Sequence, residues 1–206
     1  MVETLIILCI LFLAMVIHEY AHAWTANKLG DSTARLAGRM TLNPIKHIDP
    51  FGTIILPAVL TLLRLFGSPL FPIALAKPVP VNFMRLRNPK KDMMLVAFAG
   101  PAVNIISAIG LSLGLKMGVS GVMKEVFGLG IFINLILAIF NMVPIPPLDG
   151  SRLVMGVLPP RLSVPYSRLE PYGILIVFAL LPLGLFQKIV LPVVIVCGQF
   201  LGVSLQ

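Results

Sequence analysis

Long runs of apolar residues set the strongest limit on how this chain can fold. The first run extends from Thr4 to about Lys28 and meets no glycine or proline before Gly30. Because about 20 apolar residues in a helix cross the hydrocarbon core of a bilayer, this run predicts an unbroken transmembrane helix. Two further runs, at 93–115 and 126–142, are each about one bilayer long. The sequence therefore predicts an all-α polytopic membrane protein.

The amino-acid composition excludes a soluble enzyme. Hydrophobic residues make up 58% of the chain and charged residues only 12%, whereas soluble domains keep about a quarter of their residues charged. The formal net charge is +8, but no basic stripe with interleaved aromatic residues accompanies it. We therefore expect the excess lysine and arginine to face anionic lipid, and we expect no nucleic-acid partner. Cys9 and Cys197 lie inside apolar runs and are predicted to be small buried hydrophobic residues.

The whole chain, residues 1–206, is predicted to form one integral-membrane domain. Residues 33–42 alternate short apolar and polar residues around a glycine, which predicts a small β-hairpin at the membrane surface. Residues 51–76 are apolar but broken by prolines, an arginine and a Gly-Ser-Pro turn, which predicts a re-entrant or interfacial segment. The predicted spans are 4–28, 93–115, 126–142 and 172–190, and the apolar tail either extends the last span or adds a short helix at 190–204.

The first apolar run contains the motif His18-Glu19-Tyr20-Ala21-His22, which has the form H-E-x-x-H. On a helix, His18 and His22 project from the same face toward one metal ion, and Glu19 lies next to the open metal position as a general acid and base. Three ionisable residues within one turn of a membrane helix cost several kcal/mol or more unless they bind something. A chance match or a purely structural hydrogen-bonded cluster is therefore the weaker interpretation.

A catalytic zinc ion takes three protein ligands and keeps one open position, so a third ligand is needed. Asp149 ends the apolar, proline-broken segment 141–150, directly after a predicted span. An aspartate before glycine is also a common turn residue, which is the alternative reading. Because the chain also contains the H-E-x-x-H helix, we take Asp149 as the third metal ligand. The remaining candidates lie in connections or at span ends and are expected to be solvated surface groups: Glu3, Asp31, His47, Asp49, Asp92, Glu125 and Glu170.

Three sequence elements together resemble the site-2 protease family of intramembrane zinc metalloproteases, peptidase family M50. They are the H-E-x-x-H motif at 18–22, Ala99-Gly100-Pro101-Ala102-Val103-Asn104, and the stretch from Asn141 to Gly150. The resemblance implies a site-2-protease-like helical core in a minimal form without PDZ or CBS domains. It also implies one zinc ion per chain held by His18, His22 and Asp149, Glu19 as the catalytic acid and base, and Asn104 and Asn141 near the substrate backbone. For the two asparagines, hydrogen bonding between helices is an equally open interpretation.

The activity that the resemblance implies is hydrolysis of peptide bonds within or near the transmembrane segments of membrane protein substrates. Zinc-activated water would attack the peptide bond, with Glu19 as general acid and base. A divalent-metal membrane transporter that uses the same histidine and aspartate site is the alternative, because transporters also place ionisable residues in the membrane. Glu19 discriminates between them, since a transport site would use it as a further ligand and hydrolysis needs it as an unligated base.

A shared metal site also constrains the topology. If His22 and Asp149 bind one ion, the two helix ends that carry them lie on the same side of the membrane. The spans at 93–115 and 126–142 make two crossings, so the chain between His22 and Met93 crosses an even number of times. The segment 51–76 is too short for two crossings and should make none.

This topology gathers most lysine and arginine residues on one face, which the positive-inside rule makes cytoplasmic. We expect a protein of a prokaryotic cell (inner) membrane whose active-site opening faces the cytoplasm. Hydrolysis requires water to reach the metal from that side. The segment 51–76 and the hairpin at 33–42 are the predicted gate and the predicted edge for pairing with a substrate strand.

Overall fold

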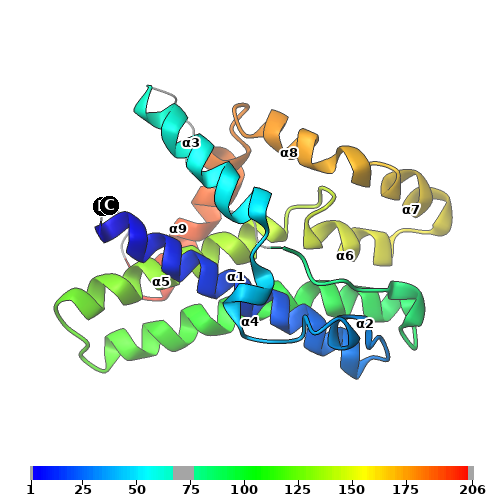
Figure 1. The fold of residues 1–206 in the computed structure, drawn as a ribbon, viewed down its shortest axis with the longest axis horizontal. Helices are drawn as coiled ribbons and strands as arrows, with labels where there is room; N and C mark the ends of the chain where they lie inside the picture. The colour runs from blue at the N-terminus through cyan, green and yellow to red at the C-terminus, as the bar shows by residue number, and fades with distance from the viewer. Residues whose placement is uncertain (1, 67–76, 204–206) are drawn as a thin grey trace.

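Three long helices form the centre of the molecule. The computed structural model describes residues 2–66 and 77–203. Its long helices are α1 (Val2–Lys28), α4 (Pro89–Lys116) and α5 (Val122–Asn141), shown in Figure 1. All three are long and apolar enough to cross a membrane, and the described residues contain no strand. The prediction of an all-α membrane protein is confirmed.

Small residues allow these helices to pack closely, while larger apolar side chains face outward. Ala26 of α1 is fully buried against α4, and Ala108 of α4 is fully buried in the cluster it forms with α5. On the outer surface, Ile106 and Leu113 are exposed. Cys9 is exposed as well, so the expectation that it is buried was wrong. An apolar outer surface of this kind suits contact with lipid, which explains why an apolar residue here need not be buried.

The residues after α1 form short helical turns and not the predicted β-hairpin. Helix α2 (Thr33–Leu36) lies where the hairpin was expected, so that prediction was wrong. The physical reason is a local competition for backbone hydrogen bonds. The buried carboxylate of Asp31 accepts a hydrogen bond from the Thr33 amide at 3.0 Å, and the Ala37 amide then donates to the Thr33 carbonyl at 3.0 Å. These helical bonds use amides that a strand ladder would need.

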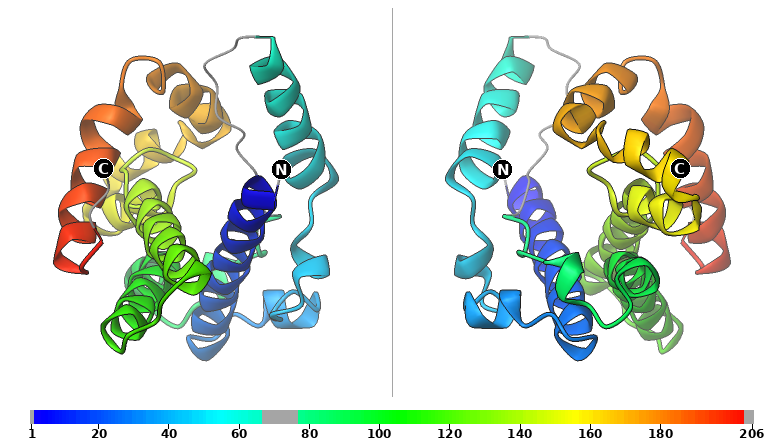
Figure 2. Two further views of the ribbon diagram at one scale, coloured as in Figure 1. Left: turned by 90° about the vertical axis from the view of Figure 1, so that its left-hand side faces the viewer. Right: turned by 90° about the vertical axis from the view of Figure 1, so that its right-hand side faces the viewer.

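Short helices continue the connection toward α4. The turn η1 (Pro44–His47) is followed by η2 (Pro50–Ile55), α3 (Leu56–Leu65) and, after the undescribed stretch, η3 (Phe83–Arg85). Helix α3 has 10 residues and is therefore about 15 Å long, about half the thickness of the hydrocarbon core. Figure 2 shows α3 to one side of the three long helices. The predicted re-entrant or interfacial segment 51–76 includes residues 67–76, which lie outside the described residues, so it stays a prediction.

The chain after α5 forms a second group of short helices. They are α6 (Asp149–Val157), α7 (Pro160–Ser167), η4 (Glu170–Tyr172), α8 (Gly173–Leu180), η5 (Phe186–Val190) and α9 (Leu191–Phe200). The range 172–190, expected as one span, is divided between α8 and η5 by a turn in which Gly184 has a φ of +96°. Helix α9 lies within the range 190–204 expected for an extra helix and packs against α5. This second group places Asp149 beside the end of α5.

Candidate metal centre

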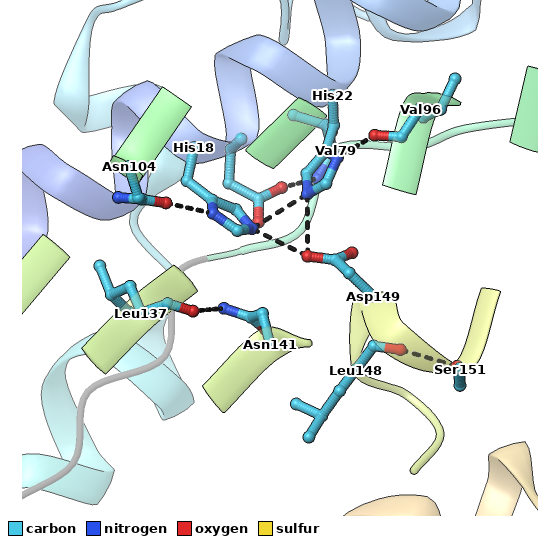
Figure 3. A network of polar contacts seen from close by, with 11 residues as sticks. His18, His22, Val79, Val96, Asn104, Leu137, Asn141, Leu148, Asp149 and Ser151 are labelled. Carbon is cyan, nitrogen blue, oxygen red and sulfur yellow. Dashed lines mark hydrogen bonds and ion pairs between the residues drawn. The ribbon is translucent and has the colours of Figure 1, made fainter. Parts of the chain in front are cut away.

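Helical spacing brings two buried histidines of α1 to one point. The Nε2 atoms of His18 and His22 lie 3.0 Å apart. The Oδ2 atom of Asp149, the first residue of α6, lies 3.1 Å from Nε2 of His18 and 3.3 Å from Nε2 of His22 (Figure 3). One potential ligand atom from each of the three residues therefore lies within 4.8 Å of the others.

The outer nitrogen of each histidine ring is hydrogen-bonded away from this point. His22 Nδ1 donates to the Val96 carbonyl at 2.7 Å, and His18 Nδ1 donates to the Asn104 side-chain oxygen at 2.6 Å. With both protons on Nδ1, the two Nε2 atoms and the Asp149 carboxylate all present lone pairs to one another. A cation between them turns this repulsion into attraction. Two imidazoles and one carboxylate, with supporting bonds to the outer ring nitrogens, are a donor set that fits zinc.

Two glycines permit the close approaches that assemble the cluster. A Cβ atom at Gly100 of α4 would lie 2.4 Å from His22 Nε2 and 2.5 Å from His18 Nε2. A Cβ atom at Gly150, directly after Asp149, would lie 2.2 Å from the Met142 carbonyl oxygen. In real proteins, Cβ atoms do not lie this close to other heavy atoms. Gly100 therefore lets α4 pass against the histidine rings, and Gly150 lets α6 begin against the end of α5.

The segment between α5 and Asp149 is tied down by hydrogen bonds to its backbone. The Ser151 hydroxyl donates to the Leu148 carbonyl at 2.7 Å, and the Tyr166 hydroxyl donates to the Pro144 carbonyl at 2.7 Å. Burial raises the pKa of Tyr166, although Arg152 partly opposes it, so this hydroxyl stays protonated and keeps its role as donor. These bonds hold the start of α6, and with it the Asp149 carboxylate, in place.

Glu19 lies beside the cluster without joining it. Its Oε2 atom accepts a hydrogen bond from the Val79 backbone amide at 2.7 Å. Glu19 lines a cavity of about 280 Å³ together with the three clustered residues. The rest of the wall consists of Pro78, Val79, Val81, Phe83, Val96, Ala97, Asn141, Pro147 and Arg152. The segment beside the candidate site is thus 78–83, and residues 33–42, the predicted edge for pairing with a substrate, are not among the lining residues.

The two asparagines lie in different places. Asn141 lines the cavity, and its Nδ2 donates to the Leu137 carbonyl at 2.9 Å. Asn104 is fully buried behind His18, is not among the cavity-lining residues, and donates to the side chain of Asn134 at 2.8 Å. Sequence reasoning missed Asn134 and Val79. An amide inside the apolar run 126–142 was an available signal for Asn134, whereas nothing in the sequence marks Val79.

The other candidate ligands stay outside the cluster in the described part of the chain. Asp31, His47 and Asp92 are buried, so the expectation of solvated groups was wrong for them. Each has a backbone partner outside the cluster: Asp31 accepts from the Asn82 amide at 2.6 Å, His47 donates to the Thr41 carbonyl at 2.8 Å, and Asp92 accepts from the Asn88 amide at 2.8 Å. Hydrogen bonds to the backbone allow such polar groups to be buried.

Comparisons with known proteins identify the family. Residues 116–184 match the profile of Peptidase family M50. The chain is 39% identical over 186 residues to the protein named "Putative zinc metalloprotease YwhC" of Bacillus subtilis (strain 168), covering 84% of this chain and 80% of that protein. It is 30% identical over 196 residues to the protein named "Putative zinc metalloprotease Rip2" of Mycolicibacterium smegmatis, covering 93% of this chain and 72% of that protein. No solved structure matches. The chain therefore belongs to peptidase family M50, the site-2 protease family of zinc metalloproteases.

Proposed function

We propose that this protein is an intramembrane-cleaving zinc metalloprotease with one zinc ion held by His18, His22 and Asp149. It hydrolyses peptide bonds within or near the transmembrane segments of membrane protein substrates. The observation that carries the proposal is the convergence of the three ligand atoms within 4.8 Å, beside an unligated glutamate and among helices long enough to span a membrane. Family membership supplies the zinc protease chemistry.

Glu19 has the position and chemistry of the general acid and base. Zinc, when bound, supplies a Lewis acid that polarises water and the scissile carbonyl group. The oxygen of the attacking water bonds to the carbonyl carbon, and the Glu19 carboxylate accepts a proton from that water. The carbon–nitrogen bond then breaks, and Glu19 returns the proton to the leaving nitrogen. The Val79 amide holds the Glu19 carboxylate at the cavity wall while leaving its second oxygen available.

The arrangement of Glu19 favours hydrolysis over metal transport. A transport site would use Glu19 as a further ligand, because additional carboxylates compensate a divalent cation inside a membrane. In the described residues, the group of potential ligands contains His18, His22 and Asp149 but not Glu19. The Glu19 carboxylate accepts from a backbone amide instead, which suits a base that must stay free of the metal.

The packing of the helices supports a topology in which 29–88 makes no net crossing. The bond from His22 to Val96 joins the C-terminal part of α1 to the N-terminal part of α4, and Asp149 follows the C-terminal end of α5. The intervening chain therefore leaves and rejoins the core at the same end. Exposed basic residues gather at this end of the core, in the connection and in the first turn of α4: Arg35, Lys46, Lys77, Arg85, Arg87 and Lys90. By the positive-inside rule this end faces the cytoplasm of a prokaryotic inner membrane.

Cleavage in a purified system tests the proposal. The protein is reconstituted with a panel of single-span membrane proteins, and products are followed by mass spectrometry with and without a zinc chelator. We expect cleavage inside or near the membrane segment, its loss with chelator and its return with added zinc. Zinc uptake into vesicles without any cleavage would support the transporter in its place.

A further inference from the structure

A chain of buried amides connects the zinc-facing histidine of α1 to the backbone of α5. We propose that Asn134, acting through Asn104, holds the His18 ring in the tautomer whose Nε2 atom can bind zinc. Asn134 is thereby a positioning residue of the metal centre. The inference rests on the zinc site of the proposed function, and it deepens that proposal by adding a residue that touches neither metal nor substrate.

Three consecutive hydrogen bonds form the connection. His18 Nδ1 lies 2.6 Å from the Asn104 oxygen, Asn104 Nδ2 donates to the Asn134 oxygen at 2.8 Å, and Asn134 Nδ2 donates to the Gly130 carbonyl at 2.8 Å. The exposed fractions of His18, Asn104 and Asn134 are 6%, 0% and 6%. Water is therefore not available to replace a bond that is lost, and each donor must meet an acceptor within the protein.

The Gly130 carbonyl sets the direction of the whole chain of bonds. A backbone carbonyl only accepts, so the NH₂ group of Asn134 must face it, which leaves the Asn134 oxygen for Asn104. The NH₂ group of Asn104 must then face that oxygen, which leaves the Asn104 oxygen for His18. An oxygen acceptor requires the proton on His18 Nδ1. The lone pair of Nε2 is then free and faces Asp149.

His22 reaches the same state by a shorter route. Its Nδ1 donates directly to the Val96 carbonyl of α4 at 2.7 Å, so one backbone group fixes its tautomer. His18 faces the Asn104 amide, which can present either oxygen or NH₂ after a half-turn. The Asn134 oxygen favours the orientation in which Asn104 turns its NH₂ group to Asn134 and its oxygen to His18. Removing that acceptor allows Asn104 to offer NH₂ to His18, which places the proton on Nε2 and opposes zinc binding.

The competing interpretation is that Asn134 only joins α4 to α5, as buried polar residues of membrane helices commonly do. Zinc affinity separates the two roles. Asn134→Leu removes the acceptor at similar size, and Asn134→Ser retains a hydroxyl for the Gly130 carbonyl but is too short to reach Asn104. Ser112→Ala is the matched control, because it removes the hydrogen bond of another buried polar residue of α4, Ser112, to the Leu201 carbonyl at 2.6 Å.

We expect both the leucine and the serine variants to bind zinc about 10-fold more weakly in competition with a chelator, the lower end of the effect of groups that support metal ligands. Ser112→Ala should bind zinc like the native protein. Asn134→Asp in its protonated form keeps an oxygen facing Asn104 and a hydroxyl that can donate to the Gly130 carbonyl, so it should retain most of the affinity. Equal affinity in all these variants would overturn the proposal. Failure of the leucine variant to fold leaves the serine and aspartate variants to decide.

The tautomer itself can be observed without zinc or substrate. The chain has only 3 histidines, so ¹⁵N labelling of histidine in the full-length, zinc-free protein gives a readily assigned ring spectrum. We expect the proton of neutral His18 on Nδ1 in the native protein and on Nε2 for a substantial fraction of Asn134→Ser, with His47 unchanged. An unchanged His18 spectrum in Asn134→Ser would refute the positioning role. If the native protein showed these tautomers but did not bind zinc, the proposed zinc site would be refuted instead.

Discussion

The Oδ2 atom of Asp149 lies 3.1 Å from the Nε2 atom of His18, although 131 positions separate the two residues in the chain. The contact joins the first long helix to a short helix that begins after the third. Neither residue can form the cluster without the packing of α1, α4 and α5 between them. Metal binding to this cluster should therefore depend on the tertiary fold and stabilise it in return.

Asp149→Ala should abolish zinc binding under conditions in which the native protein is loaded. Loss of a direct ligand should exceed the roughly 10- to 100-fold effect of losing a supporting group. Metal analysis after dialysis, with proteolysis measured in parallel, checks this. Glu170→Ala is the control, because Glu170 pairs with Arg152 outside the cluster. Full zinc occupancy and activity in Asp149→Ala would show that the third ligand is another residue.

Glu19→Gln should retain zinc and lose cleavage of a transmembrane substrate by about 10²- to 10⁴-fold, the usual contribution of acid–base catalysis. Glutamine has the same size, and its oxygen can still accept from the Val79 amide, but it cannot take a proton from water. Single-turnover cleavage and zinc content are measured on the same preparation. Cleavage at the native rate would exclude the proposed role, and loss of zinc would make Glu19 a ligand and favour transport.

Gly100→Ala should weaken zinc binding by about 10-fold, because its Cβ atom would lie 2.4 Å from His22 Nε2 and must displace the histidine rings. Overpacking of this kind commonly costs about 1–3 kcal/mol, which corresponds to roughly 5- to 150-fold in a binding constant. Chelator competition measures the effect. Gly110→Ala, on the same helix with no atom within 4 Å of its Cβ position, should bind zinc normally. Equal zinc affinity in the two variants would mean that the rings do not depend on this approach.

Cysteines introduced at Lys46 and Arg85 should react from the same side of the membrane. The segment between them includes η2 and α3, whose 6 and 10 contiguous residues are together fewer than the roughly 20 that a span needs, and both flanking connections meet the same end of the core. Labelling with an impermeant maleimide in oriented vesicles tests this after replacement of Cys9 and Cys197. Labelling from opposite sides would exclude the zero-crossing topology.

The sequence by itself determined the features that depend on local spacing and composition. Apolar runs of bilayer length specified α1, α4 and α5, because a helix in lipid must satisfy its own backbone. The four-residue interval of His18 and His22 specified a shared face, because the helical period is 3.6 residues. The cost of burying charge in a membrane marked these residues and Asp149 as a candidate site before any contact was known.

Only the tertiary structure decided which groups meet across helices. The bonds from Val79 to Glu19 and from Asn134 to Asn104 depend on the directions of side chains and on how segments pack, and no periodicity in the sequence encodes either. Residues 33–42 had a strand-like pattern, yet the amide of Asn82, 51 positions beyond Asp31, helps hold the carboxylate that begins the helical turn at 33–36. The local sequence pattern limits the conformations open to each segment. Long-range hydrogen bonds then select among those conformations, because leaving a buried polar group unpaired costs free energy.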